Sequence, residues 1–300
     1  MSPHATDPDA ASTYSNHTSA ISERLPNVDA RRSPQRLREF ELDGRVFVVT
    51  GGAQGLGLTL AEALVEAGGK VYCLDIQKEP TAPFYETQGR VAKEFGGTLN
   101  YRHVDVQNAE LVDEVIASIA AEHSRLDGLV AAAGIQNVKP ALEFTPSDID
   151  RMMGVNFKGV FHSAVSCAKQ MIKYKTPGAM VLIGSMSGLN ANKGFNSSIY
   201  NASKAAVIQL GRNLAMEWAK VIDGKPIRVN VLCPGNIMTP MVENDFKNDP
   251  NLRKTWEDAN MLGRISEMKE YRGPVLFMLS DASSFMTAGS LVIDGGYTAW

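Results

Sequence analysis

Short apolar runs alternate with longer amphipathic stretches from Phe40 to the C-terminus. A run of this length fits one buried strand, and the stretches between the runs have the apolar spacing of helices that cover a sheet. The runs that predict strands are Arg45–Thr50, Lys70–Asp75, Thr98–Val104, Gly128–Ala133, Ala179–Ser185, Ile227–Leu232 and Ser290–Ile293. The alternation predicts an α/β fold, a doubly wound parallel sheet of about seven strands with helices on both faces.

The helix with the clearest start signal follows Phe144. Thr145 is a good N-cap, Pro146 suits the first helical position and Asp148 places a carboxylate at the third. The helical signal continues to Tyr174. One long helix is therefore predicted over residues 145–174.

Residues 1–38 lack this periodic pattern. They are rich in Ser, Thr, Pro, Ala and Asp and contain few large apolar side chains. Such a segment cannot bury enough surface to offset the entropy of ordering it. We therefore expect residues 1–38 to be a disordered N-terminal tail and residues 39–300 to form a single domain.

The charge balance argues against a nucleic-acid partner. The 300 residues carry 30 Lys and Arg against 33 Asp and Glu, a net charge of -3, without a basic stripe. No apolar run approaches the ~20 residues that cross a bilayer, and the N-terminus lacks the regions of a signal peptide. Cys73, Cys167 and Cys233 match neither a zinc site nor a disulfide framework. We expect a cytoplasmic protein with buried thiols, no metal and no membrane partner.

A glycine-rich turn joins the first predicted strand to the first predicted helix. Glycines there let the backbone turn sharply and approach a pyrophosphate. The phosphate charge is then stabilised by free amides and by the positive end of the helix dipole. The residues expected to hold a dinucleotide in this turn are Gly51, Gln54, Gly55, Leu56 and Gly57.

A carboxylate, Asp75, ends the second predicted strand. Its spacing from the glycine turn lets it accept hydrogen bonds from the adenosine ribose hydroxyls. The same charge repels a 2′-phosphate, and the turn carries Gln54 instead of a basic residue. NAD is therefore favoured over NADP. At the ends of the next two strands, the residues expected to contact the cofactor are Asp105, Val106, Ala133 and Gly134.

Tyr200 and Lys204 are four residues apart in a predicted helix, so they share one face. A phenol normally titrates near ~10, but an adjacent ammonium and a nicotinamide cation both favour the phenolate. Tyr200 can then exchange a proton with a substrate oxygen. Hydroxyls at the end of a buried strand, including Ser185, and Asn156 inside the long helix add polar groups.

These motifs occur in the order found in the short-chain dehydrogenase/reductase family, which the chain resembles from Phe40 to Trp300. The matching positions are Thr50-Gly51-x-x-x-Gly55-x-Gly57, Asp75, Asp105, Ala131–Gly134, Asn156, Ser185, Tyr200 with Lys204, and Pro234-Gly235. The resemblance implies a Rossmann-type fold and a catalytic tetrad of Asn156, Ser185, Tyr200 and Lys204. In the family's scheme Ser185 orients the substrate oxygen and Tyr200 is the acid and base. Lys204 holds the nicotinamide ribose and lowers the tyrosine pKa, and Asn156 positions a water.

Two details of the resemblance stay open. Ser185 matches the family's Ser-x-x-Gly with Gly188, but Ser187 competes for the same role. The family's usual Asn-Asn-Ala-Gly is Ala131-Ala132-Ala133-Gly134 here. The amide side chains that usually brace the sheet are lost, which puts the rigidity of the sheet in question at this position but not the chemistry of the site.

The segment after the sixth predicted strand resembles the part of the family that lines the nicotinamide. The residues implied at the cofactor are Pro234, Gly235, Ile237 and Thr239, together with Tyr200 and Lys204. A charged stretch from Met241 to Arg264 follows. Its place above the cofactor predicts a substrate lid around residues 236–265.

The leading hypothesis is an NAD(H)-dependent oxidoreductase that moves hydride between the nicotinamide and a secondary alcohol or ketone. Phe40-Glu41-Leu42, Ala141-Leu142-Glu143 and the terminal Gly295–Trp300 resemble the fungal-type branch that acts on sugar alcohols and ketoses, similar to mannitol and arabinitol dehydrogenases. A homotetramer or homodimer is also implied by the resemblance.

Two alternatives remain. A ketoreductase or dehydrogenase of fungal secondary metabolism would use an apolar pocket, for which the candidates are Met186, Leu189, Phe195, Met241 and Phe246. The groups that could instead bind substrate hydroxyls are Gln136, Asn190, Asn192 and Asn196. A non-catalytic NAD-sensing regulator is the alternative of another class, but such a protein is expected to lose part of the tetrad.

Overall fold

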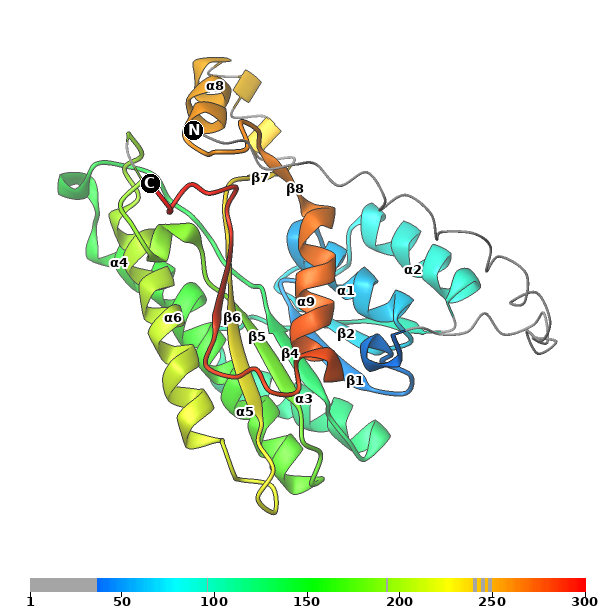
Figure 1. Ribbon diagram of the computed structural model, residues 1–300. Helices are drawn as coiled ribbons and strands as arrows, with labels where there is room; N and C mark the ends of the chain where they lie inside the picture. The colour runs from blue at the N-terminus through cyan, green and yellow to red at the C-terminus, as the bar shows by residue number, and fades with distance from the viewer. Residues whose placement is uncertain (1–36, 96, 193, 240–241, 244–245, 248–249) are drawn as a thin grey trace, which may run out of the picture. The chain divides into compact units, whose positions relative to one another are not determined.

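A parallel sheet of seven strands forms the centre of the described chain (Figure 1). The computed structural model describes residues 37–300 except 96, 193, 240–241, 244–245 and 248–249, so nearly all of the expected tail lies outside the described residues. The strands are β1 Val46–Thr50, β2 Lys70–Asp75, β3 Thr98–His103, β4 Gly128–Ala131, β5 Ala179–Ile183, β6 Arg228–Pro234 and β9 Ser290–Ile293. They lie in the order β3-β2-β1-β4-β5-β6-β9. The predicted fold class is confirmed.

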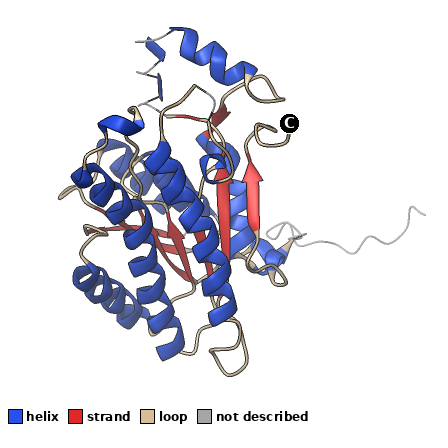
Figure 2. Ribbon diagram, turned by 90° about the vertical axis from the view of Figure 1, so that its left-hand side faces the viewer, coloured by secondary structure: helices blue, strands red, loops and turns tan. Residues whose placement is uncertain are grey.

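Helices cover both faces of this sheet (Figures 1 and 2). The apolar layer on one face includes residues of α1 Gly55–Glu66, α2 Ala82–Glu94 and α9 Arg272–Leu279. The layer on the other face includes residues of α3 Ala109–His123, α5 Val160–Lys173 and α6 Ser198–Glu217. Within β1, Phe47 and Val49 join the first layer, and Val46 and Val48 join the second. Because both faces are buried, the strand reads as a continuous apolar run.

The strands β4 and β5 end two residues earlier than predicted, at Ala131 and Ile183. After β4, the amide of Ala132 donates to the Thr50 carbonyl at 3.2 Å and that of Ala133 donates to the Thr50 hydroxyl at 3.3 Å. The chain after β4 therefore leaves the sheet while it is still hydrogen-bonded to β1. The residues that follow β4 and β5 lie beyond the paired part of the sheet, so they can contribute to a binding site.

The long helix predicted over residues 145–174 begins as expected but is interrupted. Thr145 and Asp148 form a reciprocal capping box at the start of α4 Pro146–Met153. A π-helical turn, Gly154–Gly159, then precedes α5. Turns of this kind occur mostly as single insertions in helices, frequently at functional sites. Asn156 lies inside it.

A second, two-stranded parallel sheet pairs β7 Ile237–Met238 with β8 Ser266–Glu267. The chain between these strands includes α8 Pro250–Asp258. Strands of two residues are too short for any hydrophobic period, so the sequence did not predict them. The three cysteines are buried and free, as predicted. Among the described residues, no helix combines the length and the apolar character needed to cross a membrane.

Candidate active site

The site lies where the order of the strands reverses. β1 pairs with β2 on one side and β4 on the other, and the chain passes outward from this point in both directions. The carboxyl ends of the strands at such a switch point form the crevice in which open α/β sheets bind ligands.

The glycine turn after β1 leaves no room for side chains at Gly51, Gly52 and Gly57. Gly51 has a φ of +68°, and a Cβ there would lie 2.8 Å from the Cα of Ala133. A Cβ on Gly57 would collide with the Gly51 carbonyl. The amide of Gly51 donates to the Leu74 carbonyl at 2.8 Å, which ties the turn to β2. The backbone is therefore held where only glycine allows, close to the ends of β2 and β4.

This turn leads into the N-terminus of α1. Gln54 is the N-cap residue, but its side chain makes no capping hydrogen bond. Gly55 has a φ of +57° and opens the helix, followed by half-buried Leu56 and buried Gly57. The first amides of a helix have no partner within it and sit at the positive end of its dipole. The cradle thus fits a pyrophosphate.

Asp75 stands at the carboxyl end of β2, beside the glycine turn. Its Oδ2 accepts from the Ala53 amide at 3.0 Å, and its Oδ1 accepts from the Ile76 amide at 2.8 Å. A carboxylate offers about four acceptor positions, so each oxygen can still accept from a ribose hydroxyl. The side chain is half-buried.

The other expected adenine contacts are less open than the sequence implied. The Oδ1 of Asp105 accepts from the Gln107 amide at 2.9 Å and shapes the turn before α3. Val106 is only 6% exposed and packs against Gly159 of the π-helical turn, whose missing side chain leaves space for it. Val106 therefore offers little apolar surface to a ligand and instead packs against the π-helical turn.

The catalytic candidates come from three elements. Tyr200 and Lys204 lie on α6, Ser185 precedes a 3-10 turn after β5, and Asn156 lies in the π-helical turn. The Nζ of Lys204 lies 5.7 Å from the centre of the Tyr200 ring and donates to the Ile183 carbonyl at 2.8 Å.

Gly134 lies beside two of these groups. A Cβ on Gly134 would lie 3.5 Å from Asn156 Oδ1 and 3.6 Å from Lys204 Nζ. The structure thus brings all four candidates to the carboxyl ends of β4 and β5.

Burial has the largest effect on the pKa values of Tyr200 and Lys204. It raises the pKa of Tyr200, and a hydrogen bond with Ser185 acts in the opposite direction. The role of Lys204 in lowering the tyrosine pKa stays a prediction. Burial also lowers the pKa of Lys204 to about 8, with a smaller opposing effect from Cys233.

Ser185 is favoured over Ser187 by its contacts. Both side chains are buried. The Ser185 hydroxyl accepts from the Ser187 amide at 3.1 Å and is the one bonded to Tyr200. Ser187 thus helps to fix the hydroxyl that meets the phenol.

Sequence reasoning missed Ser203. Asn156 donates through Nδ2 to the Ser203 hydroxyl at 3.1 Å, and Ser203 donates to the Tyr200 carbonyl at 2.7 Å. Asn156 also bonds both backbone groups of Ile135. Ser203 therefore links the π-helical turn to the first turn of α6. Its place between Tyr200 and Lys204 in the sequence was the available signal.

The thiol of Cys233 was assigned only to the core, yet it lies beneath the same site. A Cβ on Gly184 would lie 3.1 Å from its Sγ. Burial raises the pKa of Cys233 to about 11, while the Ser185 amide and the charge of Lys204 act in the opposite direction. The neutral thiol is thus part of the buried surroundings of Ser185 and Lys204.

The residues after β6 form the path from the sheet into the expected lid. Gly235 follows Pro234 and donates to the Ile293 carbonyl at 2.8 Å. Ile237 pairs with Ser266 in the small sheet. The hydroxyl of Thr239 accepts from the Val242 amide at 3.3 Å. These four cofactor candidates lie on one segment, and all but the buried Pro234 are half-buried.

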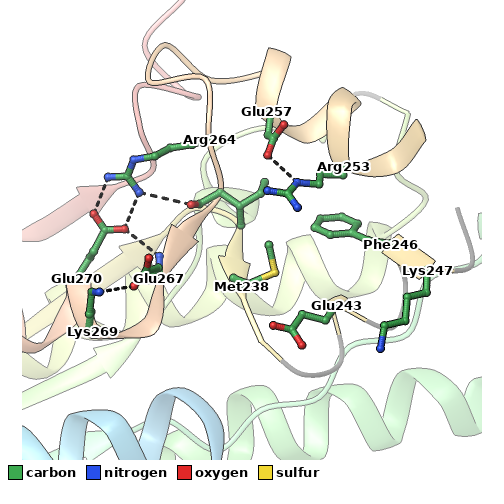
Figure 3. Close-up of a pocket in the computed structure, with 11 residues that line it drawn as sticks. Met238, Glu243, Phe246, Lys247, Arg253, Glu257, Arg264, Glu267, Lys269 and Glu270 are labelled. Carbon is green, nitrogen blue, oxygen red and sulfur yellow. Dashed lines mark hydrogen bonds and ion pairs between the residues drawn. The ribbon is translucent and has the colours of Figure 1, made fainter. Parts of the chain in front are cut away.

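A cavity of about 930 Å³ is lined by residues of the segment from Met238 to Glu270, which includes most of the expected lid (Figure 3). Its charged walls include two arginine–glutamate ion pairs, Arg253 with Glu257 at 2.8 Å and Arg264 with Glu270 at 2.6 Å. None of the four catalytic candidates lines it. This hollow is therefore separate from the place where Tyr200 and Lys204 meet.

Comparisons with known proteins identify the family of the chain. A family model described as enoyl-(acyl carrier protein) reductase matches residues 51–298. The short chain dehydrogenases/reductase notP′ of Aspergillus versicolor is 40% identical over 87% of this chain and 89% of that protein. A ribulose-forming D-arabinitol 2-dehydrogenase of Scheffersomyces stipitis is 36% identical over 87% of this chain and 96% of its own length.

An NADH-dependent L-xylulose reductase of Ambrosiozyma monospora is 37% identical over 87% of this chain and 97% of that protein. A gluconate 5-dehydrogenase from Burkholderia cenocepacia, solved with NADP and tartrate, is 31% identical with a TM-score of 0.79, covering 88% of this chain and 99% of that one. The chain therefore belongs to the short-chain dehydrogenase/reductase family and is an oxidoreductase that interconverts a secondary alcohol and a ketone with a nicotinamide cofactor.

Proposed function

We propose that this oxidoreductase uses NAD(H) and interconverts a polyol and a ketose, with Tyr200 as the catalytic acid and base. The observation that carries the proposal is the meeting of Tyr200, Ser185 and Lys204 at the carboxyl ends of the strands, where Lys204 lies beside Gly134. The similarity to proteins named for D-arabinitol and L-xylulose supports this substrate class.

In the proposed reduction, the phenol of Tyr200 gives its proton to the carbonyl oxygen of the substrate. The hydroxyl of Ser185 donates a hydrogen bond to the same oxygen and stabilises the charge that develops there. A nicotinamide cofactor held there would supply the hydride. Lys204 binds the ribose of the cofactor and returns a proton toward Tyr200. In the oxidation, each proton and the hydride would move in the opposite direction.

The choice of NAD rests on the charge near the adenosine ribose. Asp75 is held beside the glycine turn, and its carboxylate accepts from the amide of Ala53 in that turn and from the amide of Ile76 after β2. A 2′-phosphate would bring a second anion against this carboxylate. Exposed Lys78 is the nearest cation in the sequence. The relatives include both an NADH-dependent enzyme and a structure with NADP. The choice of NAD over NADP is therefore supported by this electrostatic argument and not by the relatives.

Polar groups near the site support a hydroxylated substrate. The amide of Asn201, next to Tyr200, donates to the Asn190 carbonyl at 3.0 Å and to Asn192 Oδ1 at 2.8 Å. These bonds hold the loop between Gly188 and α6 as a wall of the site. The buried Oδ1 of Asn190 has no partner among the described residues.

An aromatic cluster favours the second candidate, a ketoreductase for bulkier apolar substrates. The ring of Trp256 on α8 lies edge to face with Phe195 at 5.7 Å and with Phe246 at 5.4 Å. Met241 of the expected pocket lies outside the described residues. We keep α8 and its flanking segments as the proposed substrate lid, residues 236–265.

We also propose a cytoplasmic homotetramer or homodimer. Phe161 and Ile172 of α5 are 40% and 42% exposed, and Trp300 is 74% exposed. Apolar side chains of this size at the surface are typical of interfaces. Light scattering on the purified full chain measures the state directly.

A substrate panel tests the function. Purified full-length protein is assayed with polyols, ketoses and aromatic or polyketide-like ketones, by the absorbance of NADH and of NADPH. The proposal expects the highest kcat/KM with NADH and a polyol or ketose. Turnover of aromatic ketones alone would select the second candidate. Cofactor binding without any turnover would indicate a nucleotide-sensing protein.

A further inference from the structure

The turn that follows Asp75 is fastened to β3. Residues 75–77 leave β2 with three carbonyls, and each of them contacts a group that β3 or its end supplies. The Asp75 carbonyl accepts from the Val104 amide at 2.8 Å. The Ile76 carbonyl lies 3.1 Å from His103 Nε2. The Gln77 carbonyl accepts from the Tyr101 hydroxyl.

The register of the sheet explains how two side chains reach this turn. Cys73 lies opposite Tyr101, and Asp75 lies opposite His103. Residues two apart on a strand point to the same face, so Tyr101 and His103 share a face. The Tyr101 ring packs edge to face with Phe84 of α2 at 5.5 Å, which directs its hydroxyl along the sheet toward the turn.

The turn determines where the Asp75 carboxylate lies. Oδ1 of Asp75 accepts from the Ile76 amide, and Oδ2 accepts from the Ala53 amide of the glycine turn. The Thr81 hydroxyl donates to the Ala53 carbonyl at 2.7 Å and ties the start of α2 to the same place. A shift of residues 76–77 would therefore move the carboxylate away from the glycine turn.

We propose that Tyr101 and His103 are positioning residues that hold the turn after Asp75 in the form that binds the adenosine ribose, and so set cofactor affinity and choice. Neither residue belongs to the catalytic tetrad or to the expected cofactor contacts. The inference rests on the proposed function in one respect, the role given to Asp75.

The chemistry of both groups suits this role. A carbonyl only accepts, so His103 must carry its proton on Nε2 to bond Ile76. Burial, with a smaller effect of the Asp75 charge, raises the pKa of Tyr101 to about 12. The phenol therefore stays a donor at any working pH of the enzyme. Without these donors, the carbonyls of the turn would bond water, and cofactor binding would have to order the turn.

Tyr101→Phe tests the proposal because it removes the hydroxyl and keeps the ring against Phe84. The matched control is Tyr85→Phe, since Tyr85 is 52% exposed on α2 and no described residue bonds its hydroxyl. Calorimetry measures the Kd of ADP-ribose and of 2′-phospho-ADP-ribose for each full-length protein. Steady-state assays give kcat and both KM values, and thermal unfolding gives Tm.

The proposal expects the Kd of ADP-ribose to rise about three- to tenfold in Tyr101→Phe, the loss of one or two hydrogen bonds to a positioned turn. The Kd of 2′-phospho-ADP-ribose should change less, so the preference for NAD narrows. The kcat at saturating NADH and the substrate KM should stay as in the parent. Tyr85→Phe should match the parent throughout.

His103 gives an independent arm. His103→Leu should raise the same Kd, and His103→Gln, which keeps an N–H donor, should restore most of it. A Kd of ADP-ribose within twofold of the parent in both Tyr101→Phe and His103→Leu would overturn the inference, even with a lowered Tm. An equal rise in the substrate KM would also overturn it. If the parent protein binds 2′-phospho-ADP-ribose more tightly than ADP-ribose, the proposed NAD preference is wrong. The change in the Kd of ADP-ribose between the parent and the variants still decides the inference.

Discussion

Lys204 brings a positive charge into a buried part of the site. The residue is 5% exposed, and its ammonium is bonded to the Ile183 carbonyl. Burial lowers its pKa from 10.5 to about 8. At neutral pH the folded protein carries this cation at a cost that the unfolded chain does not bear. The cost is relieved when the group loses its proton in the folded state.

Lys204→Met makes this cost measurable. Between pH 8 and 10.5 the unfolded chain binds the proton and the folded protein does not, so stability rises with pH in this window. Relative to the variant, the free energy of unfolding of the parent should rise by up to about 3 kcal/mol across the window. Urea unfolding of both proteins at pH 7, 8, 9 and 10 measures the difference. A difference that stays flat or falls would contradict the burial of a charge here.

Tyr200→Phe should reduce kcat by ~100-fold or more, because it deletes the group that exchanges the proton. The Kd of NADH should stay close to the parent value, since the glycine turn is untouched. Fluorescence titration measures the Kd and NADH absorbance measures the rate. Tyr174→Phe, at the end of α5, is the control for loss of a phenol. One tenth of the parent activity in Tyr200→Phe would rule out this acid and base.

Asp75→Ser with Ile76→Arg should reverse the cofactor preference toward NADP. Unit charges about 4 Å apart interact by roughly 4 kcal/mol at an effective dielectric near 20, and a fraction of this gives a tenfold preference. The ratio of kcat/KM with NADH to that with NADPH is the measurement. A parent enzyme that already prefers NADPH would show that Asp75 does not exclude the phosphate, and would direct attention to Lys78.

The residues that sequence alone identified are those whose chemistry needs a particular side chain or none. Gly51 and Gly57 tolerate no Cβ, and the spacing of Tyr200 and Lys204 fixes a shared face. Ser203 was missed because its hydroxyl accepts from the Asn156 side chain of another element and donates to the backbone carbonyl of Tyr200. Only the folded chain brings the π-helical turn to α6.

At the scale of elements, α8 is joined to the loop before α6 through Trp256 and Phe195. Trp256→Ala should raise the substrate KM about three- to tenfold, because edge-to-face aromatic pairs contribute about 0.5–1.5 kcal/mol each beyond area burial. The Kd of NADH should change little. Phe285→Ala is the control, since Phe285 is fully exposed. An unchanged KM would show that α8 does not cover the substrate.

Elements with a long hydrophobic period were predictable, and elements set by local insertion were not. Apart from β3, whose sequence is mixed, the strands of the main sheet carry apolar runs, and all seven were found within about two residues, the usual scatter of such boundaries. The sheet of β7 and β8 depends on pairing between residues far apart in the chain. Its two-residue strands have no period to detect.

At the scale of the whole molecule, we expect the first 36 residues to be dispensable for catalysis. Their composition offers little apolar surface to bury. A chain that starts at Leu37 should keep its kcat/KM and its Tm within about 2 °C of the parent. Differential scanning fluorimetry and light scattering compare the two proteins. A loss of oligomer or a marked fall in Tm would identify the segment as a docking arm.

The π-helical turn at Gly154–Gly159 also limits how the gene can change in length. A π turn holds one residue more than an α turn, and removing that residue would rotate the helix before it by about 100° relative to the helix after it. Buried Met152 would then leave the core, and Asn156 would leave Ile135 and Ser203. The number of residues in this turn therefore matters to the site as much as the side chains that the turn carries.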